Sequence, residues 1–192
     1  MADPLTLTAV GAVVLTEGIK FLYQQAGEVL KRWRERKEAG KSATTEPAEV
    51  ELPSDAFEGQ LEQPQVNLAA VERLEQDLRD LRAAVADYAQ GIDNVDPRNQ
   101  QLLQATDGLR HAMEAVYGQR ITFLGEPRTA SGPSVTGEAN VDDVLGYVAG
   151  LRASKIVGGN VTGRVTAKIV RPGGQVIGVD VGTIGPNGSP SE

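Results

Sequence analysis

Hydrophobic residues near the N-terminus recur at alternating spacings of four and three, the period of one face of an α-helix. This face carries Leu15, Ile19, Leu22, Ala26, Val29 and Trp33. Asp3 and Pro4 precede it, and proline fits the first turn of a helix because its missing N–H has no partner there to lose. The pattern predicts an amphipathic helix over residues 5–38, within an N-terminal segment of residues 1–40.

Basic residues crowd the C-terminal end of this helix, where cations favour the helix dipole. Two interpretations remain open: a helix that faces a protein core, or a membrane-active helix with an apolar head and a basic collar. A transmembrane span is not expected, because Glu17 and Lys20 interrupt the apolar run. The residues that would contact a membrane or a partner helix are Leu5, Val13, Val14, Ile19, Phe21, Leu22 and Trp33.

Residues 41–65 show no hydrophobic period. Pro47, Pro53 and Pro64 interrupt this stretch, and acidic residues, serine and threonine fill much of the remainder. Such a composition predicts a disordered linker or a loop that lies on the protein surface.

Residues 66–118 predict a helical hairpin that completes a bundle. Asn67 is a suitable N-cap, Asp96 and Pro97 suit the start of a second helix, and Gly118 suits its end. The first of these two helices has a 3-4-3-4-3 seam, typical of a coiled coil, formed by Val71, Leu74, Leu78, Leu81, Val85 and Tyr88. Three amphipathic helices must bury their apolar faces, and a small bundle does so most economically.

The pattern changes after the second helix. Residues 119–134 predict a short strand and a connector, and residues 135–188 contain a repeat of valine followed two residues later by glycine. The repeated glycines are evenly spaced at Gly137, Gly150 and Gly163, and Gly178 follows after a slightly longer interval. A fixed period predicts stacked β units, each too thin to bury its own apolar residues. Two strands per rung, as in a β-arch solenoid, fit this period, and a meander of hairpins is the alternative.

Equivalent side chains of stacked repeats should form columns, and these columns are the expected assembly surface. The assembly residues are Val148, Ile156, Val161, Ile169, Val176 and Ile184. The three isoleucines are expected to form one apolar column, with Lys155 and Lys168 repelling each other on the outer face. The predicted fold class is therefore α+β, a small amphipathic helical bundle followed by a short Gly/Val-rich, β-arch solenoid-like module.

Few residues offer catalytic or ligand chemistry. The chain has no cysteine and one histidine, His111, which is expected on the surface and cannot complete a zinc site. Neither a phosphate-binding loop of the G-x-x-x-x-G-K-[ST] form nor a G-x-S-x-G elbow occurs. Asp142 and Asp143 have no neighbours that complete an oxygen cage, so a cap or turn role is expected. We therefore predict no enzymatic activity, no metal and no cofactor.

The net charge and the cysteine content limit which partners and which cellular compartment are expected. A formal charge of −7 argues against generic nucleic-acid binding. The absence of cysteine fits an intracellular protein, and the N-terminus lacks the features of a secretory signal. We expect a cytoplasmic location, with membrane association as a further candidate.

Two parts of the chain resemble a known group. Residues 1–10 (MADPLTLTAV), running into residues 19–22 (IKFL), resemble the start of HeLo-like helical bundles of fungal NACHT-type receptors, which are related to mixed-lineage-kinase-like membrane-permeabilising bundles. The Gly-rich repeats look like the β-solenoid or amyloid-signalling motif that often controls such bundles. The resemblance implies a signalling or defence role in which an N-terminal hydrophobic helix is exposed to membranes.

Together these features predict a non-enzymatic effector or adaptor with a helical module. Its C-terminal β repeats would mediate self-assembly or docking onto a protein with like repeats, and an anionic membrane is a further candidate partner. The alternative is a structural oligomer, in which the predicted seam forms a coiled coil and the repeats form a fibre.

Overall fold

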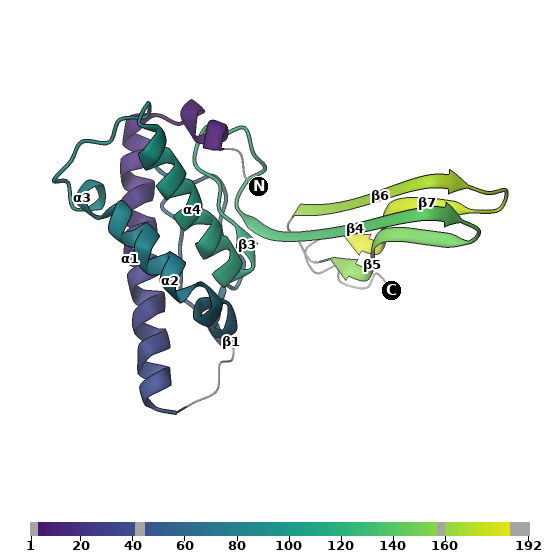
Figure 1. Cartoon of the computed structure of the whole chain (residues 1–192), viewed down its shortest axis with the longest axis horizontal. Helices are drawn as coiled ribbons and strands as arrows, with labels where there is room; N and C mark the ends of the chain where they lie inside the picture. The colour runs from purple at the N-terminus through teal and green to yellow at the C-terminus, as the bar shows by residue number, and fades with distance from the viewer. Residues whose placement is uncertain (1–3, 41–44, 157–159, 185–192) are drawn as a thin grey trace, which may run out of the picture. The chain divides into compact units, whose positions relative to one another are not determined.

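The computed structural model describes residues 4–40, 45–156 and 160–184, and the chain divides into two compact units, residues 1–132 and 133–192 (Figure 1). The fold is a mixture of helix and strand, as the sequence predicts, with the helices in the first unit and the long strands toward the C-terminus. The division lies two residues before the expected start of the repeat.

The N-terminal helix is interrupted near its start. A 3-10 helix, η1 (Pro4–Ala9), comes first, and the α-helix α1 (Ala12–Glu38) follows. Gly11 lies between them in an extended conformation, with φ −70° and ψ 154°, and serves as the N-cap of α1 without a side chain. The single helix expected over residues 5–38 is therefore two elements, because the backbone at Gly11 leaves the helical region.

Three further helices follow: α2 (Leu68–Ala84), α3 (Ala86–Ala89) and α4 (Gln100–Tyr117). Asn67 caps α2 as predicted, since its side chain accepts a hydrogen bond from the backbone N–H three residues on, at 3.1 Å. The start expected at Asp96 and Pro97 is wrong by three residues, because Asn99 is the cap of α4. Asp96 instead accepts a hydrogen bond from the N–H two residues later and forms a turn. Gly118 ends α4 in the left-handed conformation, with φ 64°.

The apolar faces of α1, α2 and α4 pack on one another and form the core of the first unit. The seam predicted as a coiled coil lies inside this bundle. Val71, Leu78 and Val85 on the seam are fully buried, and burial of each such side chain contributes about 1.5–3 kcal/mol. The seam is thus used within the chain.

Residues 45–67 pack against the bundle. Strands β1 (Thr45–Pro47) and β2 (Gln65–Asn67) pair antiparallel and close the segment between them into a loop. Within this loop Leu52 and Phe57 are buried. The Gln60 side chain holds the loop, since it accepts from the Leu52 N–H at 2.9 Å and donates to the Leu52 carbonyl at 2.7 Å. This packing differs from the disordered linker that the composition predicts for residues 41–65, as far as those residues are described.

The three phenylalanines of the chain meet in the core. The Phe57 ring lies 5.2 Å from that of Phe21 on α1 and 4.9 Å from that of Phe123, measured between centroids. Phe123 follows the two-residue strand β3 (Gln119–Arg120), which lies at the start of the segment expected to hold a short strand and a connector. Gly18 on α1 leaves room for the Phe123 ring, which a Cβ at that position would overlap.

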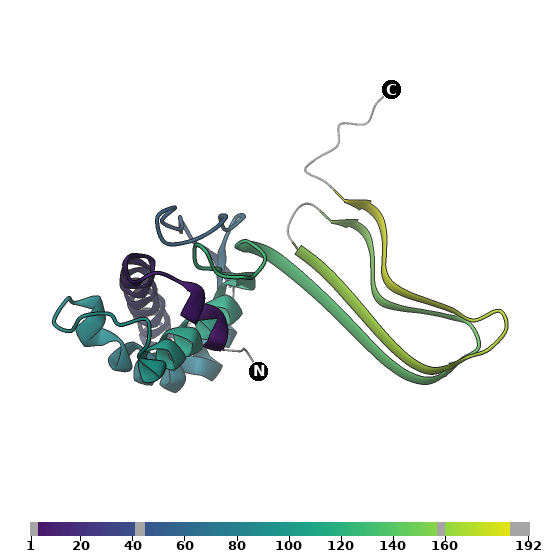
Figure 2. The same cartoon turned by 90° about the horizontal axis from the view of Figure 1, so that it is seen from above.

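The last four strands are β4 (Gly132–Val144), β5 (Tyr147–Ile156), β6 (Asn160–Val170) and β7 (Gln175–Ile184). β4 pairs parallel with β6, and β5 pairs parallel with β7 (Figure 2). We call β4 with β5 the first layer and β6 with β7 the second layer. Successive strands of a hairpin meander pair antiparallel, whereas here the pairing joins alternate strands in parallel.

Candidate functional site

The repeated glycines bring the two strands of each layer into close approach. A Cβ at Gly137 on β4 would overlap the carbonyl of Gly150 on β5. In the second layer, a Cβ at Gly163 on β6 would overlap the carbonyl of Gly178 on β7 and lie 2.7 Å from the Val179 Cγ2. Glycine is therefore required at these positions because one backbone lies against the other.

Residues alternate between a half-buried and an exposed face along β6. Val161, Gly163, Val165 and Ala167 are half-buried, and Arg164, Thr166 and Lys168 are exposed. Side chains of a strand point alternately to its two faces, so the small and branched residues line the interior of the layer. The thin interior follows from the glycines, which keep the two strands close.

Alternate copies of the repeat stack on one another. Gly137 on β4 lies opposite Gly163 on β6, and Val148 on β5 lies opposite Val176 on β7, so each copy pairs with the copy after next. Each layer uses two copies of the repeat, so the structural period is twice the sequence spacing. The longer interval before the last glycine arises from a longer turn. Residues 171–174 connect β6 to β7, whereas residues 145–146 connect β4 to β5.

The prediction that the three isoleucines form one column is therefore wrong. Ile156 and Ile184 are register partners on β5 and β7, but Ile169 lies on β6 opposite Asp143 and is 55% exposed. The predicted assembly residues divide between two sheets, because Val148 pairs with Val176 on one sheet and Val161 pairs with Val135 on the other.

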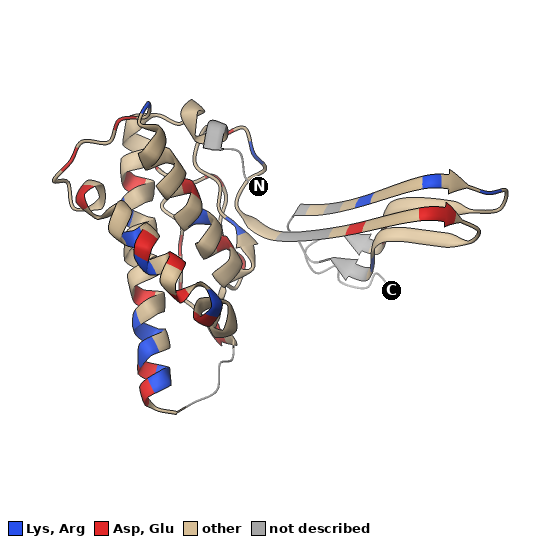
Figure 3. Cartoon of the chain, in the orientation of Figure 1, with Lys and Arg blue, Asp and Glu red and all other residues tan. Residues whose placement is uncertain are grey.

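Charges on the two layers are opposite wherever both register partners are charged. The three pairs are Glu138 with Arg164, Asp142 with Lys168, and Arg152 with Asp180. The Lys168 Nζ lies 2.7 Å from the Asp142 carboxylate, and the Arg152 Nε lies 3.4 Å from that of Asp180. In Figure 3 acidic residues colour β4 and basic residues colour β6.

This arrangement contradicts the prediction that Lys155 and Lys168 repel each other. Lys155 lies opposite Thr183 and Lys168 lies opposite Asp142, so the two lysines are not register partners. The cap or turn role expected for Asp143 is also wrong, because this residue lies in β4. Its carboxylate accepts hydrogen bonds from the Arg171 Nε at 2.7 and 2.9 Å. This hydrogen bond raises the pKa of Arg171 above its ordinary value. A hydrogen bond to Asp180 likewise raises the pKa of the Tyr147 hydroxyl.

The residues predicted for membrane or partner-helix contact do not share one surface. Ile19, Phe21, Leu22 and Trp33 are buried in the bundle, and the Trp33 Nε1 donates to the Glu75 carboxylate at 3.1 Å. Of the remaining three, Val13 is 77% exposed, Val14 is half-buried, and the side chain of Leu5 lies outside the described residues. None of the described helices is both long and apolar enough to cross a membrane.

A buried ionic cluster joins α4 to the loop that follows β3. The Arg110 guanidinium donates two hydrogen bonds to the Glu126 carboxylate, at 2.7 and 2.6 Å, and also pairs with Asp107. Thr6 on η1 donates to the same Glu126 carboxylate at 2.5 Å, which attaches the N-terminal 3-10 helix to the cluster. One feature of the sequence indicates this cluster. Arg110 follows Thr106 by four residues, which places a charged residue on the apolar stripe of α4.

His111 lies at the edge of this cluster. Its side chain is 37% exposed, and its Nδ1 lies 2.7 Å from the backbone oxygen of Asp107. The described part of the chain contains no group of three or more histidine and acidic side chains placed to hold a metal ion.

Comparison with known proteins gives no relative for this chain: no family model, no curated protein and no solved structure matches it. The strand module, with its charged layers and its close-packed glycines, is the candidate functional site.

Proposed function

We propose that the chain is a non-enzymatic adaptor or effector whose strand module assembles with the strand modules of further copies. In this proposal each layer is one rung of a short β-arch solenoid, and the second layer of one copy receives the first layer of the next. The observation that carries the proposal is the opposite charge of the two layers at every register position where both residues are charged.

Open strand edges provide the site of addition. β5 and β7 form a two-stranded sheet, and β6 is the last strand of its own sheet. Both strands of the second layer therefore end their sheets among the described residues. A row of N–H and C=O groups at a sheet edge pairs readily with another strand. A first layer that adds there in the same register would continue the two parallel sheets, with its β4 pairing beyond the part that the two-residue strand β3 already covers.

The charges select which layers can meet. If the first layer of another copy adds to the second layer, then Arg164, Lys168 and Asp180 again face Glu138, Asp142 and Arg152. If two second layers meet in the same register, each of these charges faces its own kind. Opposite charges across strands stabilise by roughly 0.2–1 kcal/mol per pair, and like charges destabilise. The charge pattern therefore favours head-to-tail addition.

The cohesion itself comes from other interactions. Exposed ion pairs contribute little to stability, and Lys168 and Asp142 are 75% and 83% exposed. Strand hydrogen bonds and paired apolar positions of the two layers, such as Val148 with Val176, would supply most of the attraction. Docking onto a different protein with like repeats would use the same edge and the same charge order.

Light scattering after size-exclusion chromatography of the full chain tests the proposal. The wild type should form assemblies whose mass grows with concentration. Lys168→Asp should suppress them, because Asp142 would then face another carboxylate both within a copy and between copies. The double variant Asp142→Lys with Lys168→Asp restores the pair and should restore assembly. A wild type that stays monomeric at all concentrations, or variants that assemble equally, would contradict the proposal.

A further inference from the structure

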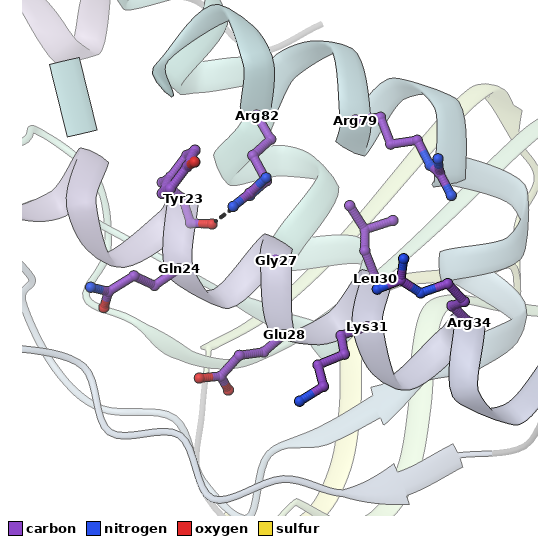
Figure 4. A pocket seen from close by; sticks show the side chains of 9 residues that line it. All are labelled: Tyr23, Gln24, Gly27, Glu28, Leu30, Lys31, Arg34, Arg79 and Arg82. Carbon is purple, nitrogen blue, oxygen red and sulfur yellow. Dashed lines mark hydrogen bonds between the residues drawn. The ribbon is translucent and has the colours of Figure 1, made fainter. Parts of the chain in front are cut away.

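A cavity of about 550 Å³ lies between α1 and α2 in the first unit (Figure 4). Four cations line it, Lys31 and Arg34 from α1 and Arg79 and Arg82 from α2. Glu28 is the one acidic side chain in the lining. The cavity therefore concentrates positive charge on a chain whose formal charge is −7.

The position of Arg82 is fixed by α1. Its Nε donates to the backbone oxygen of Tyr23 at 3.1 Å, and its guanidinium lies 3.9 Å from the centroid of the Tyr23 ring. Gly27 leaves room for this arrangement, since a Cβ there would lie 3.2 Å from the Arg82 Nε. The dashed line in Figure 4 marks the hydrogen bond to Tyr23. One cation of the cavity is thus preorganised, with only one of its donors used by the backbone.

The other cations are only partly neutralised by neighbouring carboxylates. Arg79 pairs with Glu75 at 2.6 Å, and Lys31 lies 3.9 Å from Glu35. The side chains of Lys31 and Glu35 are both more than half exposed. Within the described residues, no carboxylate forms an ion pair with Arg34 or Arg82. The cavity therefore keeps a surplus of positive charge and free guanidinium donors.

We propose that this cavity binds a compact anion that carries two or more phosphate groups. Guanidinium groups match phosphate because their planar donors can make paired hydrogen bonds to its oxygens. Cations from two helices face one cavity, which suits neighbouring phosphates better than a single carboxylate. The volume lies within the range of small-molecule sites. Such a group can belong to a soluble polyphosphate compound or to a phosphorylated lipid headgroup. This inference is independent of assembly by the strand module.

Isothermal titration calorimetry of the full chain with tripolyphosphate tests the soluble source. Arg34→Gln removes a cation that makes no ion pair among the described residues, so the fold should be preserved, and circular dichroism checks this. Loss of one charge-assisted contact should weaken binding about tenfold. The matched control is Arg73→Gln, which removes the same charge from an exposed position of α2 outside the cavity and should change affinity less than twofold.

Vesicles of phosphatidylcholine with one-twentieth phosphatidylinositol 4,5-bisphosphate, whose headgroup carries more than one phosphate, test the lipid source with the same two variants. Binding of tripolyphosphate with a selective loss in Arg34→Gln supports a soluble ligand. Binding of these vesicles with the same selective loss, and no binding of tripolyphosphate, supports a headgroup. Equal losses in the two variants, or no binding of either probe, would overturn the proposal.

Discussion

Gly163→Ala is the perturbation that bears most directly on how the strand layers are built. The added methyl group would overlap the carbonyl of Gly178 and would lie 2.7 Å from the Val179 Cγ2. Ordinary contact begins at 3.4 Å, so β6 and β7 must separate by well over an ångström at this point to admit the methyl group. The obstacle at Gly178 is backbone, which cannot rotate out of the way.

Overpacking of this kind costs about 1–3 kcal/mol. Replacement of glycine by alanine also reduces the entropy of the unfolded chain, which offsets about 0.4–1 kcal/mol. The net expectation is a local destabilisation of the second layer by about 1–2 kcal/mol. Gly146→Ala is the matched control, because no heavy atom lies within 4 Å of a Cβ built at that position and its φ is not positive. It should be neutral or slightly stabilising.

Hydrogen exchange measured by mass spectrometry is the suitable assay, since it reports each strand separately from the helical unit. A loss of about 1–2 kcal/mol should accelerate amide exchange in β6 and β7 peptides about 5- to 30-fold, with little change in α1 and α4. If Gly163→Ala and Gly146→Ala exchange at the same rate in β6 and β7, the close approach of the two strands is refuted.

Three further predictions concern the helical unit. Arg110→Leu leaves two carboxylates buried without their guanidinium and should lower the free energy of unfolding by about 3–5 kcal/mol; a loss below about 1 kcal/mol in urea denaturation would contradict the buried cluster. Burial raises the pKa of Tyr117 far above its ordinary value of 10.0, so the unfolded chain releases this proton first. Stability should therefore fall as pH rises above about 10, by up to about 1.4 kcal/mol per pH unit, and Tyr117→Phe should flatten this fall in urea midpoints measured above that pH. If the N-terminal helix is membrane-active, the double substitution of Val13 and Val14 by Asp should abolish binding of the full chain to anionic vesicles, whereas equal binding would leave only general charge attraction.

The helices could be predicted because their apolar residues recur with the period of a helix. Each buried position of the α2 seam is separated from the next by a helical spacing, and this spacing is visible without any knowledge of partners. Caps at Asn67 and Gly118 mark boundaries through local hydrogen bonding and backbone conformation. The period could not show whether the seam packs within the chain or against another chain, since both bury the same residues.

The loop of residues 48–64 could not be predicted by the same means. Leu52 and Phe57 are buried by an irregular backbone, which imposes no spacing on its apolar residues. The Gln60 side chain replaces the hydrogen bonds that a regular element would provide. Composition alone therefore favoured disorder, although two aromatic neighbours from distant segments complete the core at Phe57.

The strand module shows which part of a repeat is readable. The period, the turns and the valine-glycine pairs were visible in the sequence, but the number of copies in a layer decides which copies become neighbours. Two copies per layer place Lys168 beside Asp142 and separate Ile169 from Ile156. The sequence already places opposite charges at equivalent positions of alternate copies, as at Glu138 and Arg164, and these charges would have indicated this register.

Distance measurement between identical labels on different copies tests the head-to-tail stack most directly. The chain has no cysteine, so Thr166→Cys places one spin label on the exposed face of β6. Each copy adds two layers, and neighbouring strands lie about 4.8 Å apart. Dipolar electron paramagnetic resonance of the assembled protein should therefore show a nearest intermolecular distance of about 9.6 Å, two strand spacings, that disappears on dilution with unlabelled chain. A shortest distance near one strand spacing, or no intermolecular coupling, would contradict head-to-tail assembly.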